Sequence, residues 1–224
     1  MLKRITVLLV FMALIISCST IMMSQDEKCK KADQLISMAG LVQNTNPKLT
    51  IKHTLDAIEL CPNGVRYAYL SSVYLQMGKR EDALSASEIA LRMEPNNPFV
   101  LDRAAFCYYV QARYNDAILL LGRSLSNQPT DFVAREMLAQ IYIVQRELRK
   151  GEDELLKNIR NNPNFSLSYY SLGKLYMDEL TDFGKAHDYL GKYISIESNS
   201  NSSELKDAKK RIELLNSRMS ENKK

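Results

Sequence analysis

The chain has 224 residues, enough for one large domain or two small ones, and its 46% hydrophobic and 25% charged residues are typical of a folded soluble protein. The formal net charge is only +4, which gives no reason to invoke nucleic acid as a partner. The few prolines fall between apolar runs, and this placement favours helices over strands.

Residues 1–17 have the pattern of a secretory signal peptide. Two basic residues, Lys3 and Arg4, precede the apolar run ITVLLVFMALII, which is shorter than the roughly 20 residues needed to span a bilayer. An uncleaved anchor that extends through Met23 is the alternative, although the polar residues 17–20 interrupt that stretch. We therefore expect this segment to be removed.

The end of this segment, Ile15-Ile16-Ser17-Cys18, resembles the lipobox of bacterial lipoproteins. That resemblance implies cleavage before Cys18 and acylation of its thiol and amine, with palmitate or similar chains that hold the protein stably at a membrane of the cell envelope. The folded part would then lie outside the cytoplasm. The absence of an Asp after Cys18 favours the periplasmic side of an outer membrane, where the organism has one. Residues 18–28 are polar and charged and are expected to form a tether.

A pattern of about 34 residues then recurs through residues 29–200. Its clearest copy is 64–97, where residues with helical spacing flank a turn at Gly78-Lys79, so that two short antiparallel helices are expected. Further copies occupy 98–131, 132–165 and 166–200, and 29–63 is a degenerate copy recognised mainly by its ending, DAIELCPNG. The prolines that end the copies are spaced 33, 34 and 34 residues apart, at Pro62, Pro95, Pro129 and Pro163.

Two copies depart from the pattern. In the third, Gly151 and Asn158 stand where small residues such as Ala are usual, which suggests the loosest hairpin because a helical Gly costs roughly 1 kcal/mol. The fourth has one extra residue in its turn, DELTDFG.

This series resembles the tetratricopeptide (TPR) repeat family. The aromatic, small and proline positions of that family correspond in the clearest copy to Tyr67, Leu70, Ser71, Tyr74, Gly78, Ala83, Ser87, Ala90 and Pro95. The resemblance implies an all-α fold, a right-handed α-solenoid of about five antiparallel hairpins. Residues 201–224 add an amphipathic helix that we expect to cap the last hairpin, and a basic tail that could instead touch anionic lipid.

Signals for catalysis, metal binding and cofactors are absent from the sequence. The two histidines, His53 and His187, fall on different expected hairpins, no Cys or His pair has the spacing of metal ligands, and there is no glycine-rich phosphate loop. The interpretation is therefore that the protein is not an enzyme and needs no cofactor. Beyond Cys18, three cysteines remain: Cys107 is expected in the core, and Cys29 and Cys61 could pair.

In the TPR family, the first helices of successive hairpins line a concave groove that binds a peptide or a partner helix. The corresponding positions here are apolar and aromatic, with an expected acidic pair at Asp102 and Glu136, whereas Lys174 is too isolated to form the carboxylate clamp of chaperone-binding members. The alternative is that the tether or the C-terminal helix covers the groove. The predicted partner-binding residues are Phe99, Asp102, Phe106, Tyr109, Val133, Glu136, Gln140, Ile143, Tyr170 and Lys174.

These features predict a membrane-tethered, noncatalytic TPR adaptor that binds a segment of an envelope protein in its groove. Its architecture is similar to that of envelope assembly lipoproteins such as pilotins, although no motif is specific to them. The alternative is a ligand-handling TPR lipoprotein associated with a periplasmic solute transporter. The sequence names neither the partner nor the oligomeric state.

Overall fold

The computed structural model describes residues 23–198 and 201–221, and the predicted signal peptide and Cys18 lie outside this part of the chain. It confirms the expected all-α solenoid of five helical hairpins and a C-terminal helix. Within the described residues, no helix is long and apolar enough to cross a membrane. The helices are α2 (Gln25–Val42), α3 (Pro47–Leu60), α4 (Gly64–Gln76), α5 (Arg80–Met93), α6 (Pro98–Val110), α7 (Tyr114–Asn127), α8 (Phe132–Val144), α9 (Leu148–Asn161), α10 (Ser166–Lys174), α11 (Phe183–Ile196) and α12 (Ser203–Glu221).

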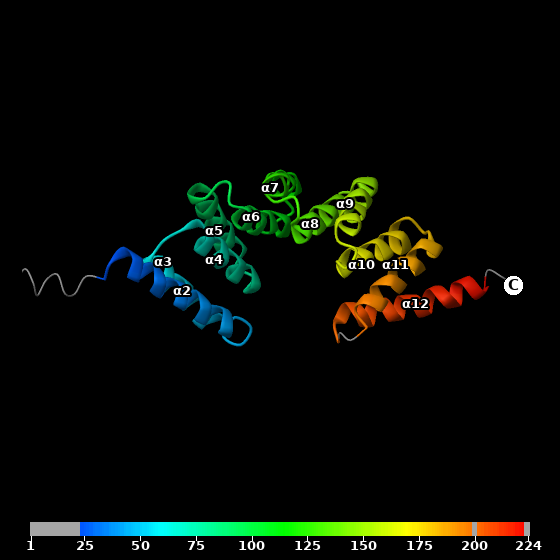
Figure 1. Cartoon of the computed structure of the whole chain (residues 1–224), viewed down its shortest axis with the longest axis horizontal. Helices are drawn as coiled ribbons and strands as arrows, with labels where there is room; N and C mark the ends of the chain where they lie inside the picture. The colour runs from blue at the N-terminus through cyan, green and yellow to red at the C-terminus, as the bar shows by residue number, and fades with distance from the viewer. Residues whose placement is uncertain (1–22, 199–200, 222–224) are drawn as a thin grey trace, which may run out of the picture.

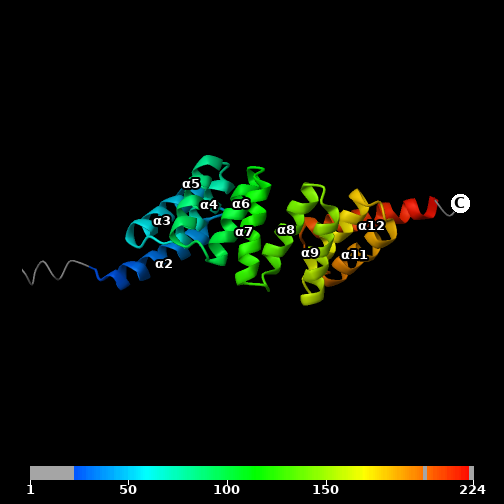
Figure 2. The same cartoon turned by 90° about the horizontal axis from the view of Figure 1, so that it is seen from above.

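The hairpins follow one another along an arch whose two ends are α2–α3 and α11–α12 (Figure 1). In this view α4, α6, α8 and α10 lie on the inner side of the arch, and α5, α7 and α9 lie on its outer side. Seen from above, the hairpins succeed one another along the long axis in chain order (Figure 2). The first helices of the central hairpins therefore form the concave face.

Local signals explain where the helices begin and end. Asn97 caps α6, where its side chain accepts a hydrogen bond from the Phe99 amide, and Pro98 is the first helical residue. Asp131 caps α8 in the same way through the Ala134 amide. Each second helix of the first four hairpins stops two residues before a proline, because a proline lacks the amide hydrogen needed to continue the ladder and restricts the residue before it.

The turns inside the last four hairpins share one geometry. A residue with positive φ follows the first helix of each, namely Gly78, Ala112, Arg146 and Thr181, and the amide next to it donates to the carbonyl of a tyrosine one turn back. In the α10–α11 hairpin the extra residue does not lengthen the loop. It widens the last turn of the helix into a π-helix, Leu175–Glu179, in which the Leu180 amide donates to the Leu175 carbonyl at 3.1 Å.

The α8–α9 hairpin is built around the two residues that suggested looseness. A Cβ atom on Gly151 would lie 2.6 Å from Cγ1 of Ile143, so the glycine permits a close helix crossing. Asn158 is fully buried, and its amide group donates to the Phe132 carbonyl at 2.9 Å and to the Ser168 hydroxyl at 3.1 Å. Both residues thus have a packing role, and Asn158 links this hairpin to the α10–α11 hairpin.

The first hairpin begins earlier than expected, because Ser24 and Glu27 form a capping box and α2 starts at Gln25. Residues 25–28 of the expected tether are therefore helical. Cys29 of α2 is disulfide-bonded to Cys61, directly after α3. The buried Arg66 side chain then joins this hairpin to the second one by donating to the Cys61 carbonyl at 2.7 Å and to the Asp33 carboxylate at 2.6 Å.

The disulfide should stabilise the first hairpin substantially. A bridge between residues 32 apart removes unfolded-chain entropy worth about 3–4 kcal/mol in the loop-closure treatment. We expect the double substitution Cys29→Ser/Cys61→Ser to lower the thermal midpoint, and dithiothreitol to reproduce this loss in the wild type but not in the variant. Equal midpoints for the oxidised wild type and the variant would contradict the pairing.

Candidate partner-binding groove

A pocket of about 250 Å³ opens between α6 and α8 at the middle of the concave face. Phe99 and Phe106 lie on the same face of α6, about two turns apart, and each is 37% exposed. Val133 at the start of α8 is 61% exposed. Large side chains exposed together in this way mark a binding surface more often than isolated ones do. The residues that line the pocket are Phe99, Asp102, Arg103, Phe106, Asp131, Val133, Ala134 and Met137.

Two carboxylates share this pocket. Asp102 projects from α6, and its Oδ1 atom is buried and accepts no hydrogen bond. The pKa of Asp102 is raised to about 6, chiefly by burial and also by the nearby Asp131 carboxylate, against the opposing effects of the Ser124 hydroxyl and the Arg103 guanidinium. The pocket therefore combines apolar walls with a carboxylate that is ionised at neutral pH at an energetic cost.

The aromatic side chains of α6 have different roles. The Arg103 guanidinium carbon lies 5.0 Å from the ring centroid of Phe99, which places a cation on that ring at the rim of the pocket. Tyr109 is half-buried and stacks between Phe106 and Tyr114, with ring centroids 6.4 and 6.0 Å apart. Of the predicted aromatic residues, Phe99 and Phe106 are thus open to a partner, and Tyr109 supports Phe106.

The expected acidic pair of Asp102 and Glu136 is wrong. Glu136 is only 5% exposed, and its carboxylate accepts hydrogen bonds from the hydroxyls of Ser168 at 2.7 Å and Ser171 at 2.5 Å. Gln140 donates to Ser171 at 2.9 Å and is also held inside this network. The acidic neighbour of Asp102 is Asp131 and not Glu136. The sequence signal that could have identified it is the position of Asp131 directly before α8, as the residue that caps this helix.

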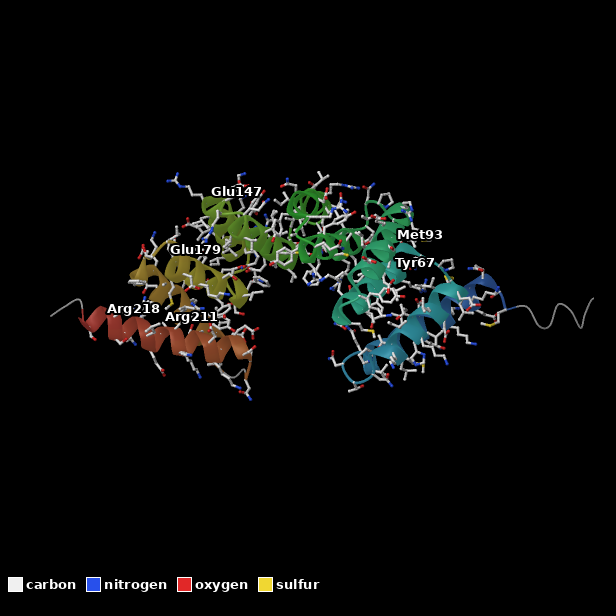
Figure 3. All side chains as sticks on the ribbon, turned by 180° about the vertical axis from the view of Figure 1, so that it is seen from behind. Tyr67, Met93, Glu147, Glu179, Arg211 and Arg218 are labelled. Atoms are coloured by element: carbon white, nitrogen blue, oxygen red, sulfur yellow. A yellow bond between two sulfur atoms is a disulfide. The ribbon has the colours of Figure 1, made fainter. Side chains whose placement is uncertain are left out.

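The C-terminal part of the predicted groove is occupied by the chain itself. The Tyr170 hydroxyl donates to Asp207 of α12 at 2.8 Å, and both burial and this carboxylate raise the pKa of Tyr170. Arg211 of α12 forms ion pairs with Asp178 at 2.8 Å and Asp207 at 2.6 Å, where α12 meets the α10–α11 hairpin (Figure 3). The alternative of a self-covered groove therefore holds for the fourth copy, whereas the pocket of α6 and α8 stays open.

Two further predicted residues contact other parts of the chain. Ile143 packs against the C-terminal core, and the Lys174 ammonium lies 5.2 Å from the ring centroid of Tyr170. The predicted residues that the structure brings together around the open pocket are Phe99, Asp102, Phe106 and Val133. The lining residues that sequence reasoning missed are Arg103, Asp131, Ala134 and Met137.

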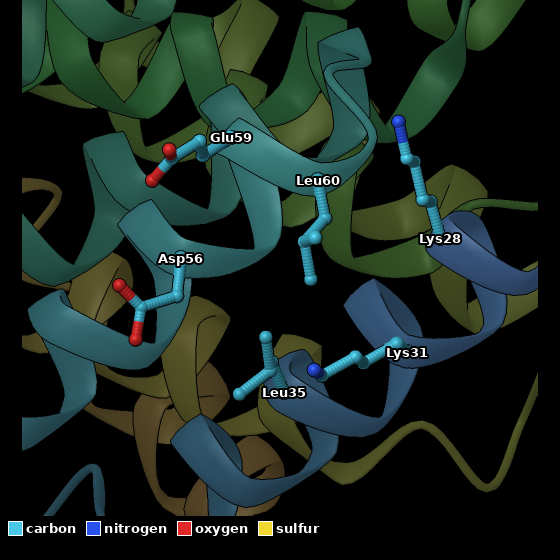
Figure 4. Close-up of a pocket in the computed structure, with 6 residues that line it drawn as sticks. All are labelled: Lys28, Lys31, Leu35, Asp56, Glu59 and Leu60. Carbon is cyan, nitrogen blue, oxygen red and sulfur yellow. The ribbon is translucent and has the colours of Figure 1, made fainter. Parts of the chain in front are cut away.

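A second hollow of about 500 Å³ lies at the first hairpin, away from this face (Figure 4). Leu35 of α2 and Leu60 of α3 point toward each other across it. Its charges are balanced, since Lys28 and Lys31 on α2 and Asp56 and Glu59 on α3 all line it. This balance offers no excess charge for a ligand, so the pocket between α6 and α8 is the stronger candidate.

Replacing Asp102 should stabilise the protein in a pH-dependent way. The carboxyl pKa is raised from 3.8 to about 6 on folding, so the ionised form destabilises the fold above pH 6 and the effect disappears below about pH 4. Because the side chain is only partly buried, solvent screening limits the gain, and we expect Asp102→Asn to stabilise by about 1 kcal/mol at pH 7.5. Urea unfolding at pH 7.5 and pH 4 checks this, with the exposed Asp153→Asn on α9 as the control. A gain of equal size at both pH values would contradict it.

No protein-family model matches the chain, and no curated protein matches it in sequence. Among solved structures, it is similar to PilW, described as a widely conserved type IV pilus biogenesis factor, with a TM-score of 0.71, 15% identity and coverage of 85% of this chain and 93% of that one. It is also similar to Pseudomonas aeruginosa PilF, with a TM-score of 0.69, 17% identity and coverage of 84% of this chain and 90% of that one. The third similar structure is YrrB, described as a TPR protein with an unusual peptide-binding site. Its TM-score is 0.57 and its identity 20%, and the match covers 79% of this chain and 90% of that one. At these identities the likeness concerns the fold, and the chain has the fold of TPR proteins.

Proposed function

We propose that this protein is a noncatalytic adaptor, tethered to a membrane through Cys18, that captures a segment of an envelope protein in its concave groove during assembly of an envelope complex. The observation that carries the proposal is the open pocket between α6 and α8, with Phe99 and Phe106 exposed at the centre of the inner face. Aromatic side chains in a pocket of this kind are the usual anchors of a protein interface.

The size of the pocket supports a segment of protein as its occupant. Sites that enclose whole small molecules usually measure roughly 300–1,000 Å³. This one is smaller, at about 250 Å³, and suits one or two side chains of a longer segment whose remainder lies along the groove. The fold it shares with YrrB, a TPR protein with a peptide-binding site, is consistent with that mode of binding.

Three observations support an envelope location. The first is the lipobox that ends at Cys18. The second is the Cys29–Cys61 disulfide, since such bonds persist in oxidising compartments outside the cytoplasm. The third is the likeness in fold to PilW, a pilus biogenesis factor.

Substituting the two exposed rings should abolish capture of the partner. We expect Phe99→Ala/Phe106→Ala to reduce the partner recovered by cross-linking in the native envelope by at least about tenfold, because buried aromatic anchors each contribute about 2 kcal/mol or more. The rings are already partly exposed, so the variant should fold, which circular dichroism checks.

The matched control is Met93→Ala/Leu119→Ala, which removes two exposed apolar side chains from the outer helices α5 and α7 (Met93 is labelled in Figure 3). It should leave recovery unchanged. Equal recovery with the folded Phe99→Ala/Phe106→Ala variant would exclude this pocket as the binding site.

The tether depends on one thiol. Cys18→Ser should prevent acylation and release the protein from the membrane fraction, because the several acyl chains on a lipoprotein cysteine provide the anchoring energy. Fractionation and a mass spectrum of the mature N-terminus measure both effects. An unmodified Met1 in the wild type would contradict the proposal.

A further inference from the structure

We propose that the pocket between α6 and α8 selects a cationic side chain, a lysine or arginine that lies next to a large apolar residue in the captured protein segment. This inference rests on the proposed function and specifies the chemistry of the partner. The charged end of the side chain would lie between Asp102 and Asp131, and its aliphatic stem would follow the apolar wall formed by Phe106, Val133 and Met137.

The first argument is the state of the two carboxylates. In the part of the chain that the structure describes, no Lys or Arg nitrogen lies within 4 Å of the carboxylate oxygens of Asp102 or Asp131. Asp131 Oδ1 accepts one bond, from the Ala134 amide at 2.8 Å, and Asp102 Oδ1 accepts none. A buried acceptor without a donor is destabilising, and an ammonium or guanidinium group beside the part of the Asp102 carboxylate that lines the pocket would neutralise its charge.

The second argument is that the nearest cation of the chain is engaged elsewhere. The Arg103 guanidinium lies over the Phe99 ring at 5.0 Å instead of pairing with an acid of the pocket. The charged groups that face Asp102 are then Arg103 from its own helix and Asp131 from the start of α8, with the Ser124 hydroxyl from α7. Two like charges in an apolar surrounding favour a ligand of opposite charge.

The third argument is the contrast with Glu136. It holds the position of Asp102 in the next copy, 34 residues later, yet it is buried and receives hydrogen bonds from Ser168 and Ser171. At this repeat position the chain therefore supplies hydrogen-bond donors to the buried carboxylate of Glu136. Of the two acids, only Asp102 lines the pocket of the groove.

The experiment is a selection of phage-displayed random peptides on the acylation-free mature chain, residues 19–224, with the disulfide intact. We expect the recovered peptides to carry Lys or Arg within two residues of a large apolar side chain. A recovered peptide is then synthesised with its basic residue as lysine and as acetyl-lysine, which keeps the stem and removes the charge. Fluorescence anisotropy measures the Kd of both.

The expected loss is about tenfold for acetyl-lysine, and about tenfold for the lysine peptide on Asp102→Asn, the typical effect of one charge-assisted contact of about 1.4 kcal/mol. Asp153→Asn should bind like the wild type. Because Asp102 titrates near pH 6, the ionised fraction falls to about one-tenth at pH 5, so wild-type affinity should fall by up to about tenfold between pH 7.5 and pH 5. Asp102→Asn should lack this pH dependence.

The outcomes separate this inference from the proposed function. Peptides that are neutral or acidic, lose affinity on Phe99→Ala/Phe106→Ala and are insensitive to Asp102→Asn would overturn the charge selection and leave groove binding intact. Recovery of no peptide that depends on Phe99 and Phe106 would overturn both. Selective binding of a second copy of the chain, or of a small cation alone, would overturn the assignment of the pocket to a partner segment.

Discussion

The close crossing of helices within three of the hairpins is the constraint on which the rest of the structure depends. A Cβ atom would lie 2.8 Å from Glu94 at Gly64, 2.6 Å from Ile143 at Gly151 and 2.5 Å from Leu190 at Gly173. A larger residue at any of these would push two helices apart, and in a solenoid each displacement is passed to the following hairpins. These glycines lie in the hairpins before and after α6 and α7, so they fix the positions of the elements on both sides of the pocket's first helix.

The junction between the α8–α9 hairpin and the α10–α11 hairpin is held by a set of buried polar side chains. Asn158, Ser168, Glu136 and Ser171 form a connected set of hydrogen bonds. Such a network is stable only when its members satisfy one another, and it ties the orientation of α10 to that of α8. It also withdraws Glu136 from the groove, so the acidic character of the inner face is concentrated at Asp102 and Asp131.

The pocket itself is a place where stability and binding oppose each other. An ionised Asp102 beside Asp131 and two phenyl rings destabilises the free protein, which is expressed as its raised pKa. The same arrangement makes the site ready for a cation, because the energy lost in the free state is recovered when the charge is neutralised. A more stable chain with Asn at this position would be a poorer receptor, in line with the usual trade-off between stability and function.

The sequence by itself determined the number and order of the hairpins and most of their ends, although α2 begins earlier than expected. These features depend on local signals: prolines, capping residues such as Asn97, and apolar residues at helical spacing. Tertiary structure decided which groove positions are free. Asp102, Glu136 and Tyr170 hold the same position in three successive copies, yet Asp102 lines the pocket, Glu136 is bonded to Ser168, and Tyr170 is bonded to Asp207. The partners of Glu136 and Tyr170 lie two helices further on, more than 30 residues along the chain. No periodic pattern within one copy encodes what a later helix places across it.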